Sequence, residues 1–246
     1  MSAATNAVMN PAITAFKDRH VVVTGGTGAL GASVVGALIN AGAHCRIPYR
    51  HEAEAARFAL RGDKAVTLVA AGDLADEAAV ARLYDAATPL WASIHIAGGF
   101  APGGVAETDK TALMQQLDGN LVSCFLCCRA AVRAMRKTGA GGRIVNVAAR
   151  PALEWRSGAG MAAYAISKTG VAALTAALAE EVVKDGILVN AVAPSIMDTP
   201  ANRAAMPKAA HDAWPKVAEV AATILFLASP DNTVTRGATV PVYGKS

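Results

Sequence analysis

Seven short apolar runs recur along this 246-residue chain, and segments with helical periodicity separate them. The runs lie near Val21, Arg46, Val66, Ile94, Ile144, Val189 and Val240. Strands that alternate with helices form parallel sheets, because each crossover returns the chain to the same edge of the sheet. The pattern therefore predicts an α/β fold in which a seven-stranded parallel sheet carries helices on both faces.

The chain fits a single α/β domain in length, and no linker, repeat or low-complexity tract divides it. We expect one domain over residues 19–246. The weakly patterned extension over residues 1–18 lacks the charged start and apolar core of a secretion signal. No apolar run looks long and uncharged enough to span a bilayer. The hydrophobic share of 53% arises mainly from alanine and valine, which suits a buried parallel sheet.

A glycine-dense turn follows the first apolar run, in TGGTGALGASVVGALINAG from Thr24 to Gly42. A strand, a glycine turn and a helix in this order are typical of a site that holds a dinucleotide pyrophosphate on helix N-terminal N–H groups. Gly25, Gly28 and Gly31 are the candidates, because the backbone approaches phosphate oxygens most closely where side chains are absent. The segment predicts a doubly wound fold of the Rossmann type, although glycine clusters also occur in ordinary turns.

Tyr164 and Lys168 lie four residues apart in AYAISKTGVAALTAALAEEV, so both side chains should project from one helical face. A neighbouring ammonium favours the phenolate and lowers a tyrosine pKa that is about 10 when unperturbed. Tyr164 would then serve as an acid or base near neutral pH. A lone pair of this kind is more often a surface tyrosine beside a solvated lysine.

Together these segments resemble the short-chain dehydrogenase/reductase family, from about Arg19 to Tyr243. Further matches follow in the family's order at Asp73-Leu74, Ala97-Gly98-Gly99, Asn120, and Asn190 with Pro194. The resemblance implies that Tyr164, Lys168 and Asn120 are catalytic, with Asn120 supporting a water-linked proton relay and Lys168 also holding the nicotinamide ribose. It implies cofactor contacts at Gly25, Thr27, Gly28, Leu30, Gly31, Asp73, Leu74, Ala97, Gly98, Tyr164, Lys168, Pro194, Ile196 and Thr199.

Three positions depart from the family's pattern. Ala29 stands where the glycine loop usually has glycine, and His95 stands where asparagine usually precedes Ala-Gly; we interpret His95 as a strand-end hydrogen-bonding residue. Ala149 occupies the position of the usual catalytic serine. Loss of one hydrogen-bond donor to developing negative charge costs about 2.7–4 kcal/mol in a preorganised site. Ser157 is a candidate replacement, although a serine in this glycine-rich loop is more simply a turn residue.

The dihydropteridine reductase branch is similar to this chain in having Tyr and Lys without that serine. Two segments of this chain also resemble the branch: the AGG-aromatic segment that ends at Phe100, and the D-T-P-x-N-R and M-P elements between Asp198 and Trp214. A quinonoid dihydropterin accepts hydride into an imine-like system, which needs a carbonyl-polarising serine less. We predict an NAD(P)H-dependent oxidoreductase that transfers hydride to a C=O or C=N group of a small molecule, with quinonoid dihydropteridine reductase as the specific alternative.

The segment 194–215 is long enough to form a lid over the substrate. The candidates for lining the substrate pocket beneath it are Ala149, Phe100, Trp155 and Met206. An aromatic pocket would suit a planar heterocycle or a quinone-like substrate.

Cofactor choice depends on the end of the second strand, AHCRIPYR. An acid there would bind the ribose 2′-hydroxyl of NAD, whereas a nearby arginine pairs with the 2′-phosphate of NADP. Tyr49 occupies the acid's position and Arg50 follows it, so NADP(H) is favoured and NAD(H) is the alternative. Arg50 is otherwise an exposed surface arginine, and dihydropteridine reductases generally favour NADH.

The net charge of +4 is spread along the chain, so we expect no nucleic-acid surface. Cys124, Cys127 and Cys128 share one predicted helix with no histidine nearby in the sequence, so we predict a buried apolar face and no metal site. Cys45 belongs to the predicted core. The absence of a disulfide pattern favours a reducing compartment, and hence a cytoplasmic enzyme.

Family resemblance also implies a homodimer or homotetramer, because the helices bearing Cys124 and Tyr164 are richer in small and apolar residues than one sheet face requires. Two other functions remain open at this stage. The first is an NADP(H)-binding regulatory protein whose chemistry is impaired by Ala149. The second is an isomerase or epimerase that retains its nicotinamide, for which the sequence has no dedicated feature.

Overall fold

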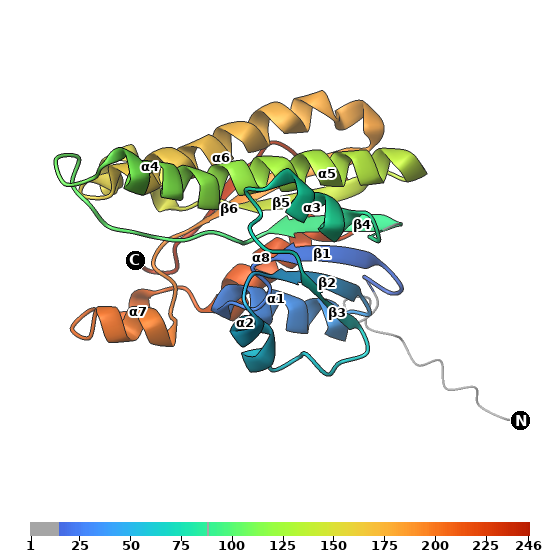
Figure 1. Cartoon of the computed structure of the whole chain (residues 1–246), viewed down its shortest axis with the longest axis horizontal. Helices are drawn as coiled ribbons and strands as arrows, with labels where there is room; N and C mark the ends of the chain where they lie inside the picture. Colours follow the sequence, from blue (N-terminus) through green and yellow to red (C-terminus); the bar gives the residue numbers. More distant parts are fainter. Residues whose placement is uncertain (1–14, 88) are drawn as a thin grey trace, which may run out of the picture.

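A seven-stranded sheet, parallel at every pairing, forms the centre of the computed structural model, which describes residues 15–87 and 89–246 (Figure 1). The strands run in the spatial order β3-β2-β1-β4-β5-β6-β7. They span β1 His20–Thr24, β2 His44–Tyr49, β3 Val66–Ala70, β4 Leu90–His95, β5 Gly142–Val147, β6 Ile187–Pro194 and β7 Thr239–Val242. All seven predicted strands are confirmed, and so is the doubly wound α/β class.

Helices follow the strands as the alternating pattern predicts. They span α1 Ala29–Asn40, α2 Glu52–Arg57, α3 Glu77–Tyr84, α4 Lys110–Leu117, α5 Ser123–Thr138, α6 Ala162–Glu181, α7 Pro200–Ala205 and α8 Val217–Ala228. Shorter helical turns are η2 Asp118–Val122, η3 Arg150–Ala152, η4 Trp155–Gly158, η5 Val183–Asp185 and η6 His211–Ala213. The π-helical turn η2 joins α4 to α5 without a break in helical dihedral angles.

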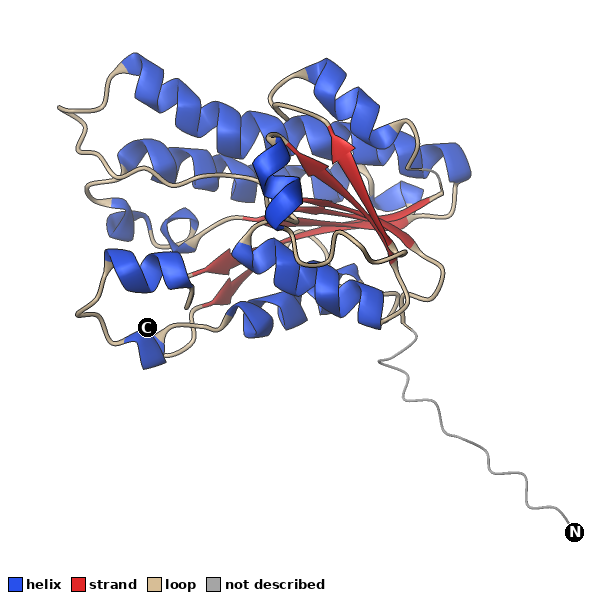
Figure 2. Cartoon of the chain, turned by 60° about the horizontal axis from the view of Figure 1, so that its bottom comes forward, coloured by secondary structure: helices blue, strands red, loops and turns tan. Residues whose placement is uncertain are grey.

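Both faces of the sheet are buried beneath helices (Figures 1 and 2). Val22 faces the core shared with α3, α5 and α6, whereas Val21 and Val23 face the core shared with α1 and α8. This alternation explains why the strands read as continuous apolar runs. The predicted extension is described only over its last residues, and Phe16 among them is 2% exposed and packs in the second core.

The carboxyl ends of β1 and β4 meet where the strand order reverses, which is the ligand-binding crevice of doubly wound sheets. Gly25 adopts φ +67° there, and a Cβ atom on it would lie 2.7 Å from the backbone nitrogen of Ala97. A Cβ atom on Gly31 would overlap the carbonyl oxygen of Gly25. The glycine turn is therefore packed too tightly for side chains at these two positions.

The α6 helix is long and apolar enough to cross a membrane by length and composition, alone among the helices in the described residues. Our expectation that no apolar run reaches this threshold was therefore wrong. The helix packs against β6 and carries both Tyr164 and Lys168. A helix that covers the sheet of an α/β domain passes the same test of composition.

All four cysteines are free and buried, as predicted. No histidine lies near the cysteines of α5 in the sequence, but tertiary packing brings His95 from the end of β4 to Cys128, with 3.5 Å between Nδ1 and Sγ. His95 does end its strand in hydrogen bonds, including one of 2.8 Å between its Nδ1 and Oδ1 of Asn146.

Candidate active site

The N-cap residue of α1 has no side chain that could accept hydrogen bonds from the N–H groups of the first turn. Its N-cap is Gly28, which has no side-chain cap, and the first turn contains no acidic residue. By contrast, Asp76, Asp109 and Thr199 cap α3, α4 and α7 with side-chain oxygens. An uncapped helix N-terminus behind a glycine turn fits a dinucleotide pyrophosphate, because the free N–H groups and the helix dipole both favour an anion.

Asn120 is held in the π-helical turn between α4 and α5. Its Oδ1 accepts from the Gly99 N–H at 3.0 Å, and its Nδ2 donates to the Gly99 carbonyl at 3.0 Å and to Oγ of Ser167 at 3.1 Å. The side chain is 1% exposed. The helix bulge therefore ties the segment after β4 to α6, and such bulges are frequent at functional sites.

Lys168 and Tyr164 lie one turn apart on α6, as predicted, but they do not hydrogen-bond to each other. Nζ of Lys168 donates to the Val147 carbonyl at 2.9 Å, and burial lowers the pKa of this lysine to about 8. Burial also raises the pKa of Tyr164 to about 12. The expected lowering of the tyrosine pKa is therefore wrong for this structure, because burial disfavours the charged phenolate.

Gly98 is where the cofactor and catalytic candidates meet. A Cβ atom there would overlap Oδ1 of Asn120 and would lie 3.4 Å from Nζ of Lys168. The preceding residue, Ala97, donates its N–H to Oγ1 of Thr24 at 3.2 Å. The structure thus brings the Ala97–Gly98 segment, the β1 turn, Asn120 and Lys168 into one crevice.

Ala149 lies at the carboxyl end of β5, where the family's serine is expected, and is 6% exposed. It follows Val147, whose carbonyl accepts from Lys168, by two residues. Ser157 does not replace the missing donor, because its hydroxyl donates to the Glu154 carbonyl at 2.7 Å within the same exposed turn. The interpretation of Ser157 as a turn residue is confirmed.

Arg50 and Asp73 lie together at the ends of β2 and β3. Nη2 of Arg50 is 3.3 Å from Oδ2 of Asp73, and the two side chains are 60% and 48% exposed. An exposed pair of this kind contributes about 0–1 kcal/mol, so the guanidinium remains available to an incoming phosphate at little cost.

Phe100, Trp155 and Met206, the aromatic and methionine candidates for the substrate pocket, lie in different surroundings. Phe100 lies edge-on to Tyr164, with ring centroids 5.1 Å apart and an interplanar angle of 89°. Trp155 is 75% exposed and lines an open groove with Ala162 and Ile166, on a different face of α6 from Tyr164. Met206 ends α7, and its carbonyl accepts from His211. Of the three, Phe100 directly contacts a catalytic candidate.

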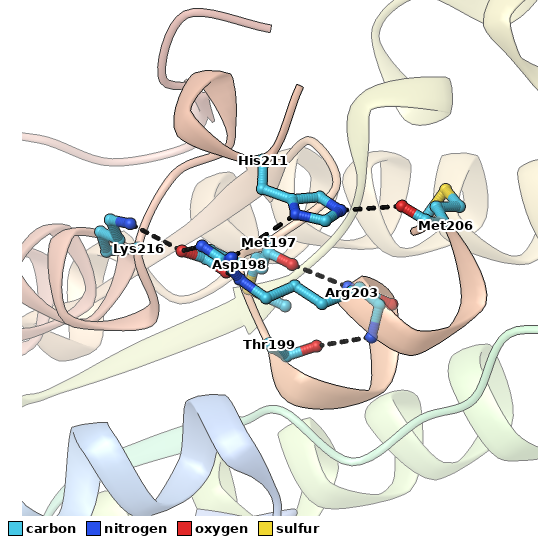
Figure 3. A network of polar contacts seen from close by, with 8 residues as sticks. Met197, Asp198, Thr199, Arg203, Met206, His211 and Lys216 are labelled. Atoms are coloured by element: carbon cyan, nitrogen blue, oxygen red, sulfur yellow. Dashed lines mark hydrogen bonds and ion pairs between the residues drawn. The ribbon is translucent and has the colours of Figure 1, made fainter. Parts of the chain in front are cut away.

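A network of polar contacts around Asp198 joins the two ends of the segment that is predicted to form a lid (Figure 3). Asp198 accepts from Arg203, with Nε–Oδ1 at 2.5 Å and Nη2–Oδ2 at 3.0 Å, and from Nζ of Lys216 at 2.6 Å. The Asp198 N–H also donates to the Pro215 carbonyl at 2.9 Å. Hydrogen bonds from Arg203 and Lys216 hold the pKa of Asp198 well below its usual range. The two ends of the segment are thereby joined at its base.

The remaining cofactor candidates differ in what their side chains do. Leu30 and Leu74 pack with the two cores, so any contact with a cofactor would come from their backbones. Pro194 ends β6, Thr199 caps α7 by accepting from the Asn202 N–H, and Ile196 between them is 45% exposed. Thr27 is half-buried in the glycine turn.

Two contributors were missed by the sequence reasoning. Ser167 holds Asn120, and its position directly before Lys168 was a usable signal. The Val147 carbonyl, which holds Lys168, has no sequence signal because every residue carries a carbonyl.

A doubly wound sheet with an uncapped glycine turn and a Tyr-Lys pair at its crevice defines a class of nicotinamide-dependent oxidoreductases. Residues 19–210 match the short chain dehydrogenase family. The chain belongs to this family, and it is an NAD(P)-dependent short-chain oxidoreductase.

Named relatives span nearly the whole chain. Galactitol 2-dehydrogenase of Rhizobium johnstonii is 34% identical, covering 91% of this chain and 93% of its own. Cis-4-hydroxycyclohexanecarboxylate dehydrogenase of Sinomonas cyclohexanicum is 34% identical, covering 94% and 97%. Among solved structures, ElxO with NADP bound superposes with a TM-score of 0.82 at 24% identity, covering 92% of this chain and 98% of that one. The similarity to ElxO supports the assignment of the fold.

Replacement of Lys168 by methionine should stabilise the cofactor-free protein at pH 7. The folded protein there holds a buried ammonium whose pKa is about 8, against its usual 10.5. Methionine removes the cost of burying the ammonium, but it also removes one hydrogen bond to the Val147 carbonyl. The net result should be an increase in the free energy of unfolding of about 2 kcal/mol. As pH rises from about 8 to 10.5 the wild type loses this penalty, so the difference should shrink. Urea titrations across this range measure it.

The matched control is Lys184→Met, at an exposed lysine of η5. It should leave the urea midpoint nearly unchanged. A destabilised Lys168→Met protein, or a stability gain that does not change with pH, would contradict a buried ammonium at this position.

Proposed function

We propose that this protein transfers hydride between NADP(H) and a C=O or C=N carbon of a small molecule, with Tyr164 exchanging the proton. The observation that carries the proposal is the meeting of Asn120 and Lys168 against Gly98, one helical turn from Tyr164. Bound NADPH would supply the hydride. The residues of the chain supply binding, orientation and the proton.

Tyr164 is a neutral phenol in the cofactor-free protein, which is the protonation state that a donor requires. A pKa of about 12 makes it a reluctant donor near neutral pH, since general acids work best with pKa values near the working pH. Lys168, in the same crevice, is the cation that would stabilise the phenolate left after transfer. Asn120 fixes the backbone beside Gly98, because both ends of its amide are bound to Gly99.

Two features support NADP(H) over NAD(H). Arg50 lies at the end of β2 beside Asp73, which is a predicted cofactor contact, and Tyr49 stands where an acid would favour the unphosphorylated ribose. The structural neighbour ElxO was solved with NADP bound. The Asp73 carboxylate competes for Arg50, so a 2′-phosphate would have to displace a weak ion pair.

The substrate class that the relatives favour is a secondary alcohol or its ketone. Both named relatives are dehydrogenases of hydroxyl compounds. A quinonoid dihydropterin remains the second candidate, because Ala149 leaves the site without the serine donor and the ring of Phe100 lies against Tyr164. A planar conjugated acceptor would stack on that ring and depend less on the missing hydroxyl.

Self-association and a cytoplasmic location stay predictions. Phe125 on α5 is 48% exposed and Ile166 on α6 is 56% exposed, which supports burial of these helices against a second copy of the chain. The four free cysteines support a reducing compartment.

The test of function is the rate of NADPH and NADH oxidation with an activated diketone and, separately, with a quinonoid dihydropterin. We expect turnover of the diketone with NADPH preferred. Tyr164→Phe should lower the rate by about 10²–10⁴-fold, as loss of a general acid does, while NADPH binding measured by fluorescence persists. Retained binding is the control that separates lost chemistry from lost folding.

Preference for the pterin would instead identify the second candidate and explain Ala149 as an adaptation. Binding of NADPH without turnover of either substrate would overturn the enzymatic proposal in favour of a regulatory binder. A Tyr164→Phe protein with full activity would remove the proton donor from the mechanism.

We also propose that residues 194–215 act as a lid anchored by Asp198. Asp198→Asn should weaken both ion pairs at its base, so trypsin should cut at Arg203 or Lys208 about three- to tenfold faster, which corresponds to about 0.7–1.4 kcal/mol. Digestion timed by mass spectrometry measures this. Glu180→Gln removes the exposed pair with Arg236 and should leave cleavage of the lid unchanged. Equal cleavage in both variants would reject Asp198 as the anchor.

The self-association prediction is tested by sedimentation velocity. Ile166→Glu would place a charge in the proposed interface and should yield a smaller species than the wild type. Val105→Glu, at a 78% exposed valine in the loop after β4, is the matched control and should not change the sedimentation coefficient. A wild-type protein that sediments as a monomer at micromolar concentration would refute the interface.

A further inference from the structure

Four metal-binding atoms face one another in the core between the sheet and α5. Nδ1 of His95 and the Sγ atoms of Cys124 and Cys128 all lie within 4.8 Å of one another. His95 and Asn146 are register partners on β4 and β5, and Oδ1 of Asn146 lies 3.4 Å from Sγ of Cys124 and 3.5 Å from Sγ of Cys128. All four residues are at most 5% exposed.

The amide of Asn146 has its oxygen turned toward the thiols. Its Nδ2 donates to Oγ1 of Thr175 at 2.9 Å, and that hydroxyl donates to the Val171 carbonyl at 2.8 Å. Oγ1 of Thr175 therefore acts as the acceptor for the Asn146 amide. Oδ1 of Asn146 accepts hydrogen bonds from Nδ1 of His95 and from both thiols, and it is the atom of this side chain that could ligate a metal ion.

His95 is supported from behind, as metal-binding histidines usually are. Its Nε2 lies 2.8 Å from Oγ of Ser93 and 3.2 Å from the hydroxyl of Tyr84. These hydroxyls lie 2.6 Å apart, and either can donate or accept. In this structure Nδ1 donates to Oδ1 of Asn146, which can only accept. Because the Ser93 and Tyr84 hydroxyls can accept a proton from Nε2, the imidazole can change to the tautomer whose Nδ1 lone pair binds a metal ion.

Three of the distances among the four atoms match the edges of a tetrahedral zinc site. Zinc–sulfur distances of about 2.3 Å and zinc–nitrogen or zinc–oxygen distances of about 2.0–2.2 Å give sulfur–nitrogen and sulfur–oxygen edges of about 3.6 Å. The observed edges are 3.5 Å from Cys128 to His95, and 3.4 and 3.5 Å from the two thiols to Asn146. The 2.8 Å edge between His95 and Asn146 is a hydrogen bond that would break on metal binding and lengthen to about 3.4 Å.

Charge balance also favours a divalent ion. Two thiolates, one neutral imidazole and one amide oxygen give a donor set of charge −2, which a buried zinc ion neutralises. Sulfur and imidazole donors select zinc over magnesium or calcium. Four protein donors leave no open position, which is the mark of a structural rather than a catalytic site.

We propose that His95, Cys124, Cys128 and Asn146 form a closed structural site for zinc. The ion would join the ends of β4 and β5 to α5, directly beyond the helix bulge that carries Asn120. It would thereby hold the helix that positions Asn120 against the sheet. The site rests on residues outside the proposed hydride-transfer chemistry, so it stands or falls independently of that function.

The test uses the full chain without a polyhistidine tag, produced in zinc-supplemented medium and purified under reducing, oxygen-free conditions. Metal analysis by mass spectrometry should find about one zinc per chain. Refolding with Co²⁺ should produce a thiolate-to-cobalt charge-transfer band. Both signals should persist in Cys45→Ala, which removes a buried thiol outside the cluster.

Both signals should be lost in His95→Asn and in Cys128→Ser, two independent variants checked for folding by circular dichroism and NADPH binding. Zinc should also raise the melting temperature of the wild type and not that of His95→Asn, because an ion that binds only the folded state stabilises it. A wild-type protein that takes up neither ion during refolding would overturn the proposal. So would a folded His95→Asn or Cys128→Ser protein that retains the ion.

Discussion

The parallel pairing of β1 with β4 is the contact on which the site depends. Thr24 is the register partner of His95, and just beyond them the Ile96 N–H donates to the Thr24 carbonyl and the Ala97 N–H to the Thr24 hydroxyl. These bonds press the Gly25 turn against Ala97. The phosphate turn and the segment leading to Gly98 therefore share one crevice, although about seventy residues separate them in the chain.

Asn120 and Lys168 are held mainly by hydrogen bonds to backbone atoms, with one further bond from Asn120 to the Ser167 hydroxyl. Asn120 is bound at both ends to Gly99, and Lys168 is bound to Val147. The ammonium has no carboxylate partner among the described hydrogen bonds and ion pairs of Lys168, and burial lowers its pKa. Such an arrangement destabilises the folded protein and is typical of functional sites, where a perturbed group is available for chemistry.

Sequence patterns predicted the fold well, because the class of fold depends on local spacing. Apolar runs and helical periods placed all seven strands, and a four-residue spacing placed Tyr164 and Lys168 on one turn of α6. The ring of Phe100 contacts that of Tyr164, whereas its place in a substrate pocket stays a prediction. The direction of the Tyr164 pKa shift was not predictable, because it is decided by burial among residues distant in sequence.

Local patterns in the sequence therefore determined the class of fold and the placement of Tyr164 and Lys168 on one helical turn, since helices and parallel strands place side chains at regular intervals. Packing alone decided which distant groups touch. Trp155 falls on a groove away from Tyr164, and His95 meets Cys124 and Cys128 across a sheet–helix interface that no sequence spacing reports. Burial and long-range contact are properties of the assembled core, so only the tertiary structure could reveal them.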